Sequence, residues 1–304
     1  MGVLPGGYWD GTGRLHREFE LAALTGREEE LLAQTRRPQA ATLVTEVLSR
    51  CVRRLGEISP VPPEVARQLL VADRHYLLLQ LRQATFGDLV RANLICPWPD
   101  CGRRVSLDFS LAEVPVEQPR QRAPVHTMTL SAAALHGGDA ARDAVNPDDA
   151  ALAEVSFRLP NGADQEELSE RLAHNEAEAL TLLLSRCVQR IGPSGPPDEH
   201  QVAALSALAR SEIEECMQQL APKVEQTMEA TCAECGRTFV APFDIQRFFL
   251  GELRTDGELL YQEVHYLAYH YHWGEQEIME MTRDKRRRYI DVLADAIEVL
   301  NSGA

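Results

Sequence analysis

The chain has 304 residues, of which 44% are apolar and 25% are charged, so it is long enough for two cored domains and has the composition of a soluble protein. Its formal net charge of −15 argues against general binding of nucleic acid, because such binding requires a basic surface. No apolar run is long enough to cross a bilayer, and the N-terminus lacks the layout of a secretory signal, so we expect a cytoplasmic protein without membrane contacts.

An internal repeat organises the sequence. A shift of 136 residues places residues 48–56 on residues 184–192, and only two of these nine positions differ, both mildly. The same shift aligns Thr25, Gly26 and Glu28 with Asn161, Gly162 and Asp164. Similarity at a fixed offset indicates two copies of one structural unit rather than two unrelated domains.

Each copy begins with a short strand and a helix start. The strands are expected at Phe19 and Leu21 in copy one and at Phe157 and Leu159 in copy two, where apolar and polar residues alternate. In copy one, Thr25 and Glu28 fit a capping box, in which both side chains satisfy N–H groups at the helix N-terminus. In copy two, Asn161 or Asp164 can cap the corresponding helix alone.

Two helices follow in each copy. The helices that contain Cys51 and Cys187 are expected to end at Gly56 and Gly192, because glycine favours a helix C-terminus and proline-rich connectors come next. The longer helices after these connectors have as apolar residues Leu69, Leu70, Tyr76, Leu77 and Leu81 in copy one, and Leu205, Leu208, Ile213, Met217 and Leu220 in copy two.

Four of the seven cysteines form two pairs, Cys96 with Cys101 and Cys232 with Cys235, and a glycine follows each pair. This spacing is typical of zinc knuckles, and four thiolates would complete one closed tetrahedral Zn²⁺ site with a structural role. The strands that should return from these turns are 105–109 and 238–243. Two alternatives are open: unrelated buried thiol pairs, and a thioredoxin-like redox pair at Cys232 and Cys235.

These patterns predict an α+β fold, mostly helical, with two related β-helix-helix-zinc-ribbon repeats that share the four-cysteine site. The predicted boundaries are repeat 1 at 1–111, a flexible linker at 112–150, repeat 2 at 151–250 and a C-terminal helical segment at 251–304. The linker is rich in Pro, Ala, Gly and charged residues. Trp273 and Gly274 interrupt the helical periodicity of the last segment, which indicates a small multi-helix unit.

The remaining candidate groups favour structural roles. Cys51 and Cys187 lie on the apolar faces of equivalent helices and Cys216 lies on a later helix, and all three are expected to be core residues. His270 and His272 are two residues apart and cannot face one ligand from a helix, so with His265 they indicate an interfacial or surface role. The Lys285-Arg286-Arg287-Arg288 run has acidic neighbours and predicts a solvated helix face. Motifs for phosphate binding, acyl transfer or metal-dependent hydrolysis are missing from the sequence, so we expect a protein that is not an enzyme.

Several motifs of copy one resemble the baseplate hub assembly chaperone family of T-even phages, whose relatives occur in phage-derived contractile injection systems. The motifs are Leu4-Pro5-Gly6-Gly7, the helix start at 24–32, the helix from Asp73-Arg74 to Leu81-Arg82, Thr85-Phe86-Gly87 and the following cysteine pair. The resemblance covers copy one through about Leu111 and, in a diverged form without Asp-Arg and Thr-Phe-Gly, residues 155–249. The C-terminal segment is similar to small helical proteins encoded in the same clusters.

The resemblance implies a non-enzymatic assembly chaperone or minor structural component of a contractile tail baseplate, free in the cytoplasm or incorporated into the particle. Its expected partners are hub or wedge subunits, with no small-molecule substrate and no membrane. One alternative is a zinc-ribbon regulator that binds nucleic acid through Arg103, Arg104 and the Lys285 to Arg288 run. A second alternative is a redox enzyme that uses Cys232 and Cys235.

Overall fold

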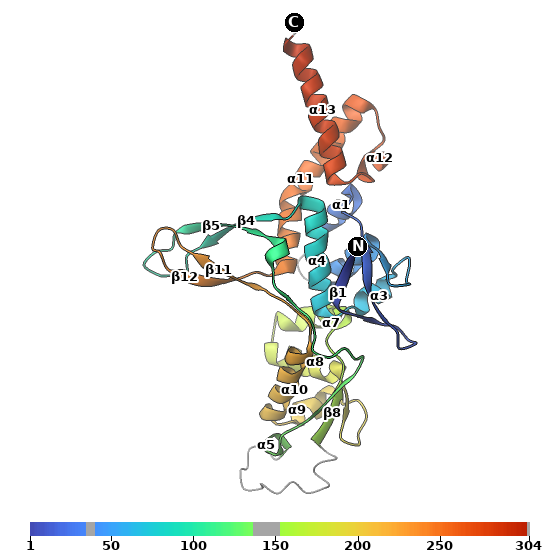
Figure 1. Cartoon of the computed structure of the whole chain (residues 1–304), viewed down its shortest axis with the longest axis vertical. Helices are drawn as coiled ribbons and strands as arrows, with labels where there is room; N and C mark the ends of the chain where they lie inside the picture. The colour runs from blue at the N-terminus through green and yellow to red at the C-terminus, as the bar shows by residue number, and fades with distance from the viewer. Residues whose placement is uncertain (35–39, 136–152, 303–304) are drawn as a thin grey trace.

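The computed structural model describes residues 1–34, 40–135 and 153–302 and is a mixed α/β structure, about half of it helical. Figure 1 shows four parts: a first half at the centre, a second half below it, an arm of two hairpins on one side, and C-terminal helices that project at the opposite end from the second half. A helix that is long and apolar enough to cross a membrane does not occur in the described ranges.

The first half is a three-stranded antiparallel sheet packed against helices. Its strands, in sheet order, are β1 (Gly2–Trp9), β2 (Leu15–Leu21) and β3 (Val52–Leu55). Its helices are α1 (Gly26–Gln34), α2 (Ala40–Cys51), α3 (Pro63–Gln68) and α4 (Val71–Phe86). Helix α4 packs on both β1 and α2, so one apolar core joins sheet and helices, with Phe19, Leu48 and Leu77 buried in it.

The second half has the same order of elements, with one additional short helix between its first two strands. Its strands, in sheet order, are β7 (His126–Thr129), β8 (Glu154–Phe157) and β9 (Val188–Ile191). Its helices are α5 (Ala132–Leu135), α7 (Gly162–Leu172), α8 (Glu176–Cys187), α9 (Glu199–Ala204) and α10 (Ala207–Leu220). The partner pairs Phe19↔Leu55 and Leu21↔Val52 of the first sheet recur 136 residues later as Val155↔Ile191 and Phe157↔Val188. Strands at the same offset therefore pair in the same register.

The predicted helix caps form to different extents. At α7 the capping box is complete: Asn161 accepts N–H groups of the first turn, and Asp164 accepts the Asn161 N–H. At α1 only the reverse half forms, because Glu28 Oε2 accepts the Thr25 N–H at 3.0 Å while the Thr25 hydroxyl donates to the same carboxylate at 2.6 Å. Both helices nevertheless begin where the sequence predicted.

Two predicted helix boundaries are wrong. Helices α2 and α8 end at Cys51 and Cys187, and the next four residues in each half are β3 and β9 rather than a last helical turn. The β-branched residue after each cysteine starts an extended segment that pairs with β2 or β8. The predicted long helix of copy one is also divided, because Leu69 is extended and Leu70 forms a bridge with Asn161 of the second half.

The predicted linker contains regular structure. Residues 112–135 include β6 (Val116–Glu117), β7 and α5, while residues 136–152 lie outside the described residues. β6 pairs with β10 (Lys223–Val224), and β7 completes the second sheet through backbone hydrogen bonds to β8. The expectation of one flexible linker over 112–150 is therefore wrong for its first part, because these short segments find strand partners far along the chain.

The N-terminus of α7 joins the two halves. The Gly162 N–H donates to Leu69 O at 3.0 Å, and the Val71 N–H donates to Pro160 O at 3.2 Å. Arg74, which is fully buried, fills the space beside Gly162 and donates to Thr45 Oγ1 at 2.8 Å and to backbone carbonyls of the first half. A side chain at position 162 would enter the volume that the Arg74 guanidinium occupies.

Replacing Gly162 with alanine is expected to destabilise the protein by about 1–3 kcal/mol, the usual cost of overpacking a filled site. The added Cβ would lie 2.2 Å from Arg74 Nη1 and 2.8 Å from Arg67 O, so either the guanidinium or the backbone must move. Denaturant unfolding monitored by circular dichroism measures the loss. Gly195→Ala is the control, because a Cβ there meets nothing within 4 Å; equal stabilities for both variants would contradict the close packing at Gly162.

The C-terminal segment is anchored in the first half. It consists of α11 (Ile245–Tyr271), α12 (Glu275–Met279) and α13 (Arg283–Ser302), so the predicted helical pieces exist, but the predicted boundary at residue 251 falls inside α11. Helix α11 starts inside the first core, where Ile245 and Phe249 are buried, and packs along α1 and α4. Further along, Leu260, Leu267 and Ile278 form a small core of their own.

The basic run at the start of α13 is not uniformly solvated, which corrects the prediction. Arg286 is fully buried and pairs with Glu29 of α1 at 2.9 Å and with Glu263 of α11 at 2.9 Å. Lys285, Arg287 and Arg288 are exposed as predicted. The run therefore includes one internal residue, because α13 crosses α1 and α11 with only one of its faces.

Candidate metal centre

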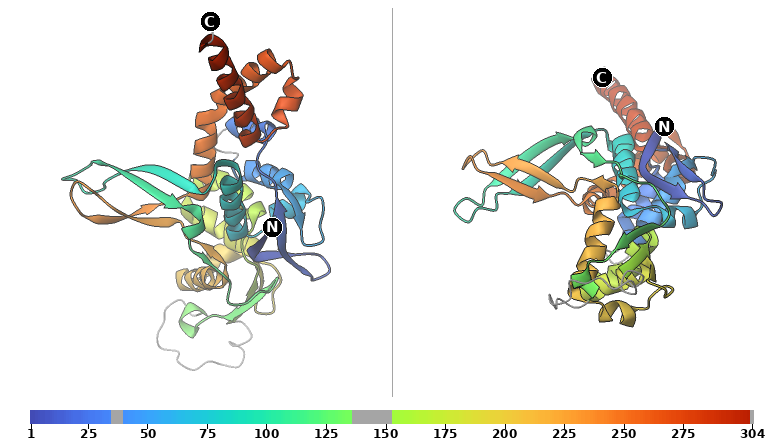
Figure 2. Two further views of the ribbon diagram at one scale, coloured as in Figure 1. Left: turned by 45° about the horizontal axis from the view of Figure 1, so that its top comes forward. Right: turned by 60° about the horizontal axis from the view of Figure 1, so that its bottom comes forward.

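Two hairpins form the arm that carries the paired cysteines. The first consists of β4 (Leu89–Ile95) and β5 (Arg104–Ser110), and the second of β11 (Thr227–Thr231) and β12 (Thr238–Pro242). The hairpins lie side by side in the views of Figures 1 and 2. The predicted β-return segments after each cysteine pair therefore exist, and each belongs to a separate two-stranded sheet.

Each cysteine pair occupies the turn of its hairpin. The Cys96 N–H donates to Arg103 O at 2.8 Å and the Cys232 N–H donates to Arg237 O at 3.0 Å, which closes both turns. The glycine after each pair has a positive φ, 57° at Gly102 and 70° at Gly236, a conformation that residues with a side chain rarely adopt. The turns therefore require glycine at these two positions, and they direct the paired sulfurs to one side.

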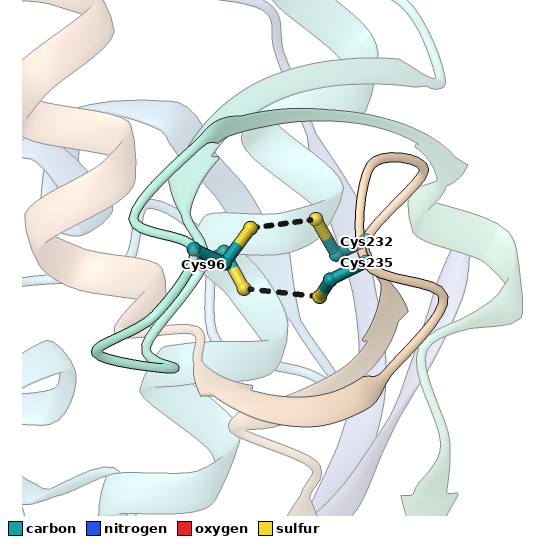
Figure 3. A group of neighbouring side chains, drawn as sticks. Cys96, Cys232 and Cys235 are labelled. Carbon is teal, nitrogen blue, oxygen red and sulfur yellow. Dashed lines mark hydrogen bonds between the residues drawn. The ribbon is translucent and has the colours of Figure 1, made fainter.

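The cysteine sulfurs point toward one another between the two hairpins, and the dashed lines in Figure 3 join sulfurs of opposite turns. All four Sγ atoms lie within 4.8 Å of one another; Cys96 to Cys235 is 3.8 Å and Cys101 to Cys232 is 3.7 Å. Zn–S bonds of about 2.3 Å in a tetrahedron place sulfurs about 3.8 Å apart, whereas a disulfide needs about 2.05 Å. The donor set and its spacing therefore fit a tetrahedral metal ion.

The environment of the sulfurs suits a shielded site. Cys96 and Cys232 are buried, while Cys101 and Cys235 are half-buried. Burial raises the pKa of Cys96 to about 12, whereas backbone N–H groups of Cys235 and Glu234 that donate to the sulfur lower the pKa of Cys232 to about 7. A bound cation would favour the thiolate at each cysteine, and four protein ligands would leave no position for substrate.

Contacts around the sulfurs join the two turns, and sequence reasoning missed them. Arg237 of the second turn donates to both carboxylate oxygens of Asp100 in the first, at 2.8 and 2.5 Å, and its guanidinium lies 5.3 Å from the Trp98 ring centroid. Leu94, Val105 and Phe239 pack beside the cysteines. The sequence places Asp100 beside the first cysteine pair and Arg237 beside the second, and these opposite charges could have predicted the ion pair.

The other sequence candidates lie apart from this centre. Cys51 and Cys187 are buried in the two separate cores, as expected, and burial raises the pKa of each to about 12. Cys232 and Cys235 sit in a hairpin turn rather than at a helix N-terminus, which disfavours a thioredoxin-like role. His265, His270 and His272 are exposed, and among the described residues only the four arm cysteines form a metal-ligand group.

Asp73 and Thr85, which belong to the motifs of the family resemblance, form hydrogen bonds within the first half. The buried Asp73 carboxylate accepts the N–H groups of Gly6 and Gly7 at 2.8 and 2.7 Å, which holds β1 against α4. Thr85 Oγ1 accepts the Leu24 N–H at 3.2 Å and donates to Leu81 O at 2.8 Å. Residues that the sequence marks as motif positions therefore act as internal hydrogen-bond partners.

Replacing Asp73 with alanine is expected to lower the free energy of unfolding by about 2–4 kcal/mol, because two buried N–H groups lose their acceptor. Asp108→Ala, at a side chain that is 58% exposed, is the matched control and should change stability by less than about 0.5 kcal/mol. Urea unfolding of both variants provides the comparison. A loss at Asp73 no larger than at Asp108 would show that Asp73 does not hold β1.

Comparison with models of protein families matches residues 11–250 to the family described as T4 bacteriophage base plate protein. The searches of curated proteins and of solved structures give no match. The matched region includes most of the first half, the whole second half and both cysteine turns. Because it spans well over half of the sequence, the chain belongs to the T4 bacteriophage base plate protein family.

Proposed function

We propose that this protein is a non-enzymatic assembly chaperone or minor structural component of a contractile phage-tail-like baseplate, and that it holds hub or wedge subunits in an assembly-competent state. The observation that carries the proposal is the family match over residues 11–250, which gives a baseplate-related structural or assembly role. A contractile injection system derived from a phage is an equally suitable setting, because it uses the same kind of baseplate. No small-molecule substrate is part of this proposal.

The use of buried charged groups supports a role without catalysis. Asp73 holds two backbone N–H groups, Asp164 holds Arg158 and Arg186, and Arg286 pairs with two glutamates. Each of these groups is hydrogen-bonded or ion-paired to residues of other segments and thereby joins elements of the fold. Their partners are structural, so none of them is left as a candidate acid or base.

We also infer that the two halves are copies of one unit and that one Zn²⁺ ion is shared by their cysteine pairs. The inference is supported by the sequence offset of 136, by the equal strand registers of the two sheets, and by the sulfur spacing. Each copy in the sequence contributes one hairpin and two ligands. The ion would therefore join the two hairpins into one rigid arm, which is the part of the body that extends farthest to the side (Figure 2).

The role in assembly can be tested by deleting the gene and imaging the particles by electron microscopy. Incomplete tails or loose hub and wedge subcomplexes are the expected result, and complementation with the intact chain should restore complete tails. Mass spectrometry of purified particles separates a chaperone, which leaves, from a component, which stays. Normal numbers of complete, contractile tails in the deletion strain would end the proposal.

The alternative of a nucleic-acid-binding regulator has less support. Arg286, in the centre of its basic run, is buried in ion pairs and cannot reach a phosphate. Arg103 and Arg104 are exposed on the arm, but the chain as a whole carries a charge of −15. A flat mobility-shift titration with DNA and RNA at low salt is the expected result.

A further inference from the structure

A cavity of about 410 Å³ lies at the junction of the two halves. Its wall combines β1, the segment before β7, and the turn between β8 and α7, so residues from both halves face it. We call it the junction cavity; among its lining residues are Tyr8, Trp9, Gln68, Arg122, His126 and Arg158. A ligand here would contact both halves at once.

The junction cavity has a positive lining in an acidic protein. Its charged lining residues are Arg122 and Arg158, and the described wall includes no aspartate or glutamate although the chain carries a net charge of −15. Arg158 is already paired with Asp164, at 2.6 Å. Arg122 donates to Gln118 Oε1 at 2.8 Å and to Pro5 O at 3.5 Å, and a charge of opposite sign that acts on it is the buried carboxylate of Asp73, behind the wall. Among the described residues it forms no direct ion pair, so it is the arginine of this wall that can still pair with a carboxylate.

A second arginine reinforces this charge. Arg17 Nη2 and Arg122 Nη2 both donate to the neutral amide oxygen Gln118 Oε1, at 2.9 and 2.8 Å. Two guanidinium groups therefore meet at an acceptor without charge, where a carboxylate would be the usual partner. Burial, and next the charge of Arg122, lower the pKa of Arg17, while the charge of Asp73, whose carboxylate also accepts the N–H groups of Gly6 and Gly7, acts in the opposite direction.

The wall also contains groups that suit a peptide. Tyr8 and Trp9 provide aromatic surface, and Pro119, Pro124 and Pro222 add rigid apolar surface. His126 is 4% exposed, stacks on Phe157 with ring centroids 5.9 Å apart, and has a buried Nε2 atom without a hydrogen-bond partner. Because this nitrogen is itself buried, a ligand in the cavity cannot reach it, and the aromatic and proline surfaces are the groups that suit a peptide.

We propose that the junction cavity binds a carboxylate-bearing peptide segment of a partner protein, with the carboxylate at Arg122 and apolar side chains against Tyr8 and Trp9. A guanidinium group binds carboxylates through parallel N–H donors, and the aromatic and proline surfaces favour a peptide over a small inorganic anion. The proposal deepens the proposed function by giving the chemistry of a bound partner. It does not depend on the cysteine centre.

The test uses the full chain and a fluorescein-labelled peptide selected on it from a random twelve-residue library, with binding measured by fluorescence anisotropy. We expect the selected peptides to contain aspartate or glutamate next to apolar residues. Arg122→Ala should weaken binding about tenfold or more, as expected for a lost charged hydrogen bond, and so should replacing the peptide's acid with its amide. Arg120→Ala, at an exposed arginine outside the cavity wall, is the matched control and should leave affinity unchanged.

Three results would overturn the proposal: failure to select any peptide, selection of peptides without an acid, or equal affinities for Arg122→Ala and Arg120→Ala. Competition by inorganic phosphate at the peptide's own concentration would also overturn it, because the site would then hold a free oxyanion. Arg122 is exposed, so both variants should have the same melting temperature as the parent chain. This binding assay is separate from particle imaging, so failure of the peptide proposal and failure of the assembly role are distinguishable.

Discussion

Replacing Cys96 with serine is expected to reduce bound zinc from about one ion per chain to nearly none, because one lost thiolate opens a site that needs four ligands. The same result is expected for Cys232→Ser. Elemental analysis of protein purified without chelators gives the metal content. Cys216→Ser is the control, because Cys216 is half-buried on α10, away from the arm. The Cys216→Ser protein should keep its bound zinc.

Loss of the zinc ion should make both hairpins more mobile. Among the residues that the structure describes, the apolar side chains packed with the four cysteines are Leu94, Val105 and Phe239, so the outer arm has little apolar surface to hold it without the ion. Hydrogen exchange should therefore speed up over residues 89–110 and also over 227–242 in either single variant, while the two halves keep their protection. A Cys96→Ser chain that kept its metal, or whose second hairpin stayed protected, would contradict a shared site.

Replacing Arg286 with methionine is expected to lower the free energy of unfolding by about 3–5 kcal/mol, the usual cost of removing one partner from a buried ion pair. Arg286 has no exposed side-chain surface, and the side chains of Glu29 and Glu263 are only 7% and 14% exposed. Both carboxylates would lose their main counter-charge. Urea unfolding gives the loss, and Arg288→Met, at an exposed arginine of the same run, is the matched control.

The loss at Arg286 should depend on pH. Burial raises the pKa of Glu29, and the charge of Arg286 acts in the opposite direction, so the variant should raise this pKa further. A carboxyl group whose pKa is raised on folding stabilises the protein below its ordinary pKa and loses that contribution as pH rises. The deficit should therefore be larger near pH 8 than near pH 5. Adding Glu29→Gln should recover part of the loss at pH 8, and a pH-independent deficit would exclude this account.

The sequence allowed prediction of those features that depend on local pattern. The offset repeat, the cysteine spacing and the helix starts at Thr25 and Asn161 are readable because each rests on residues a few positions apart. The strands β3 and β9 were not predicted because each has only four residues and directly follows a helix. The apolar spacing of such a short segment fits both the helical and the strand period. At this length, the pairing partner rather than the pattern determines the structure.

Features that depend on distant partners could not be predicted. Arg286 looks like its neighbours in sequence, and its burial follows from Glu29, which lies 257 residues upstream. The junction cavity likewise requires β1, the segment before β7 and the turn before α7 to meet, and none of these carries a motif for binding. The ion pair between Arg237 and Asp100 joins residues that are 137 positions apart, and it forms only because the fold brings the two cysteine turns together.

The pairing of β6 with β10 has a consequence for the order of folding. The chain leaves the first half at Val116 and returns beside the same point at Val224, so the second half is an excursion between two adjacent strands. The core of the first half needs Phe243, Ile245 and Phe249, which are synthesised only after that excursion. During synthesis, all the strands and helices of the second half are therefore made before residues 243–249 can complete the core of the first half.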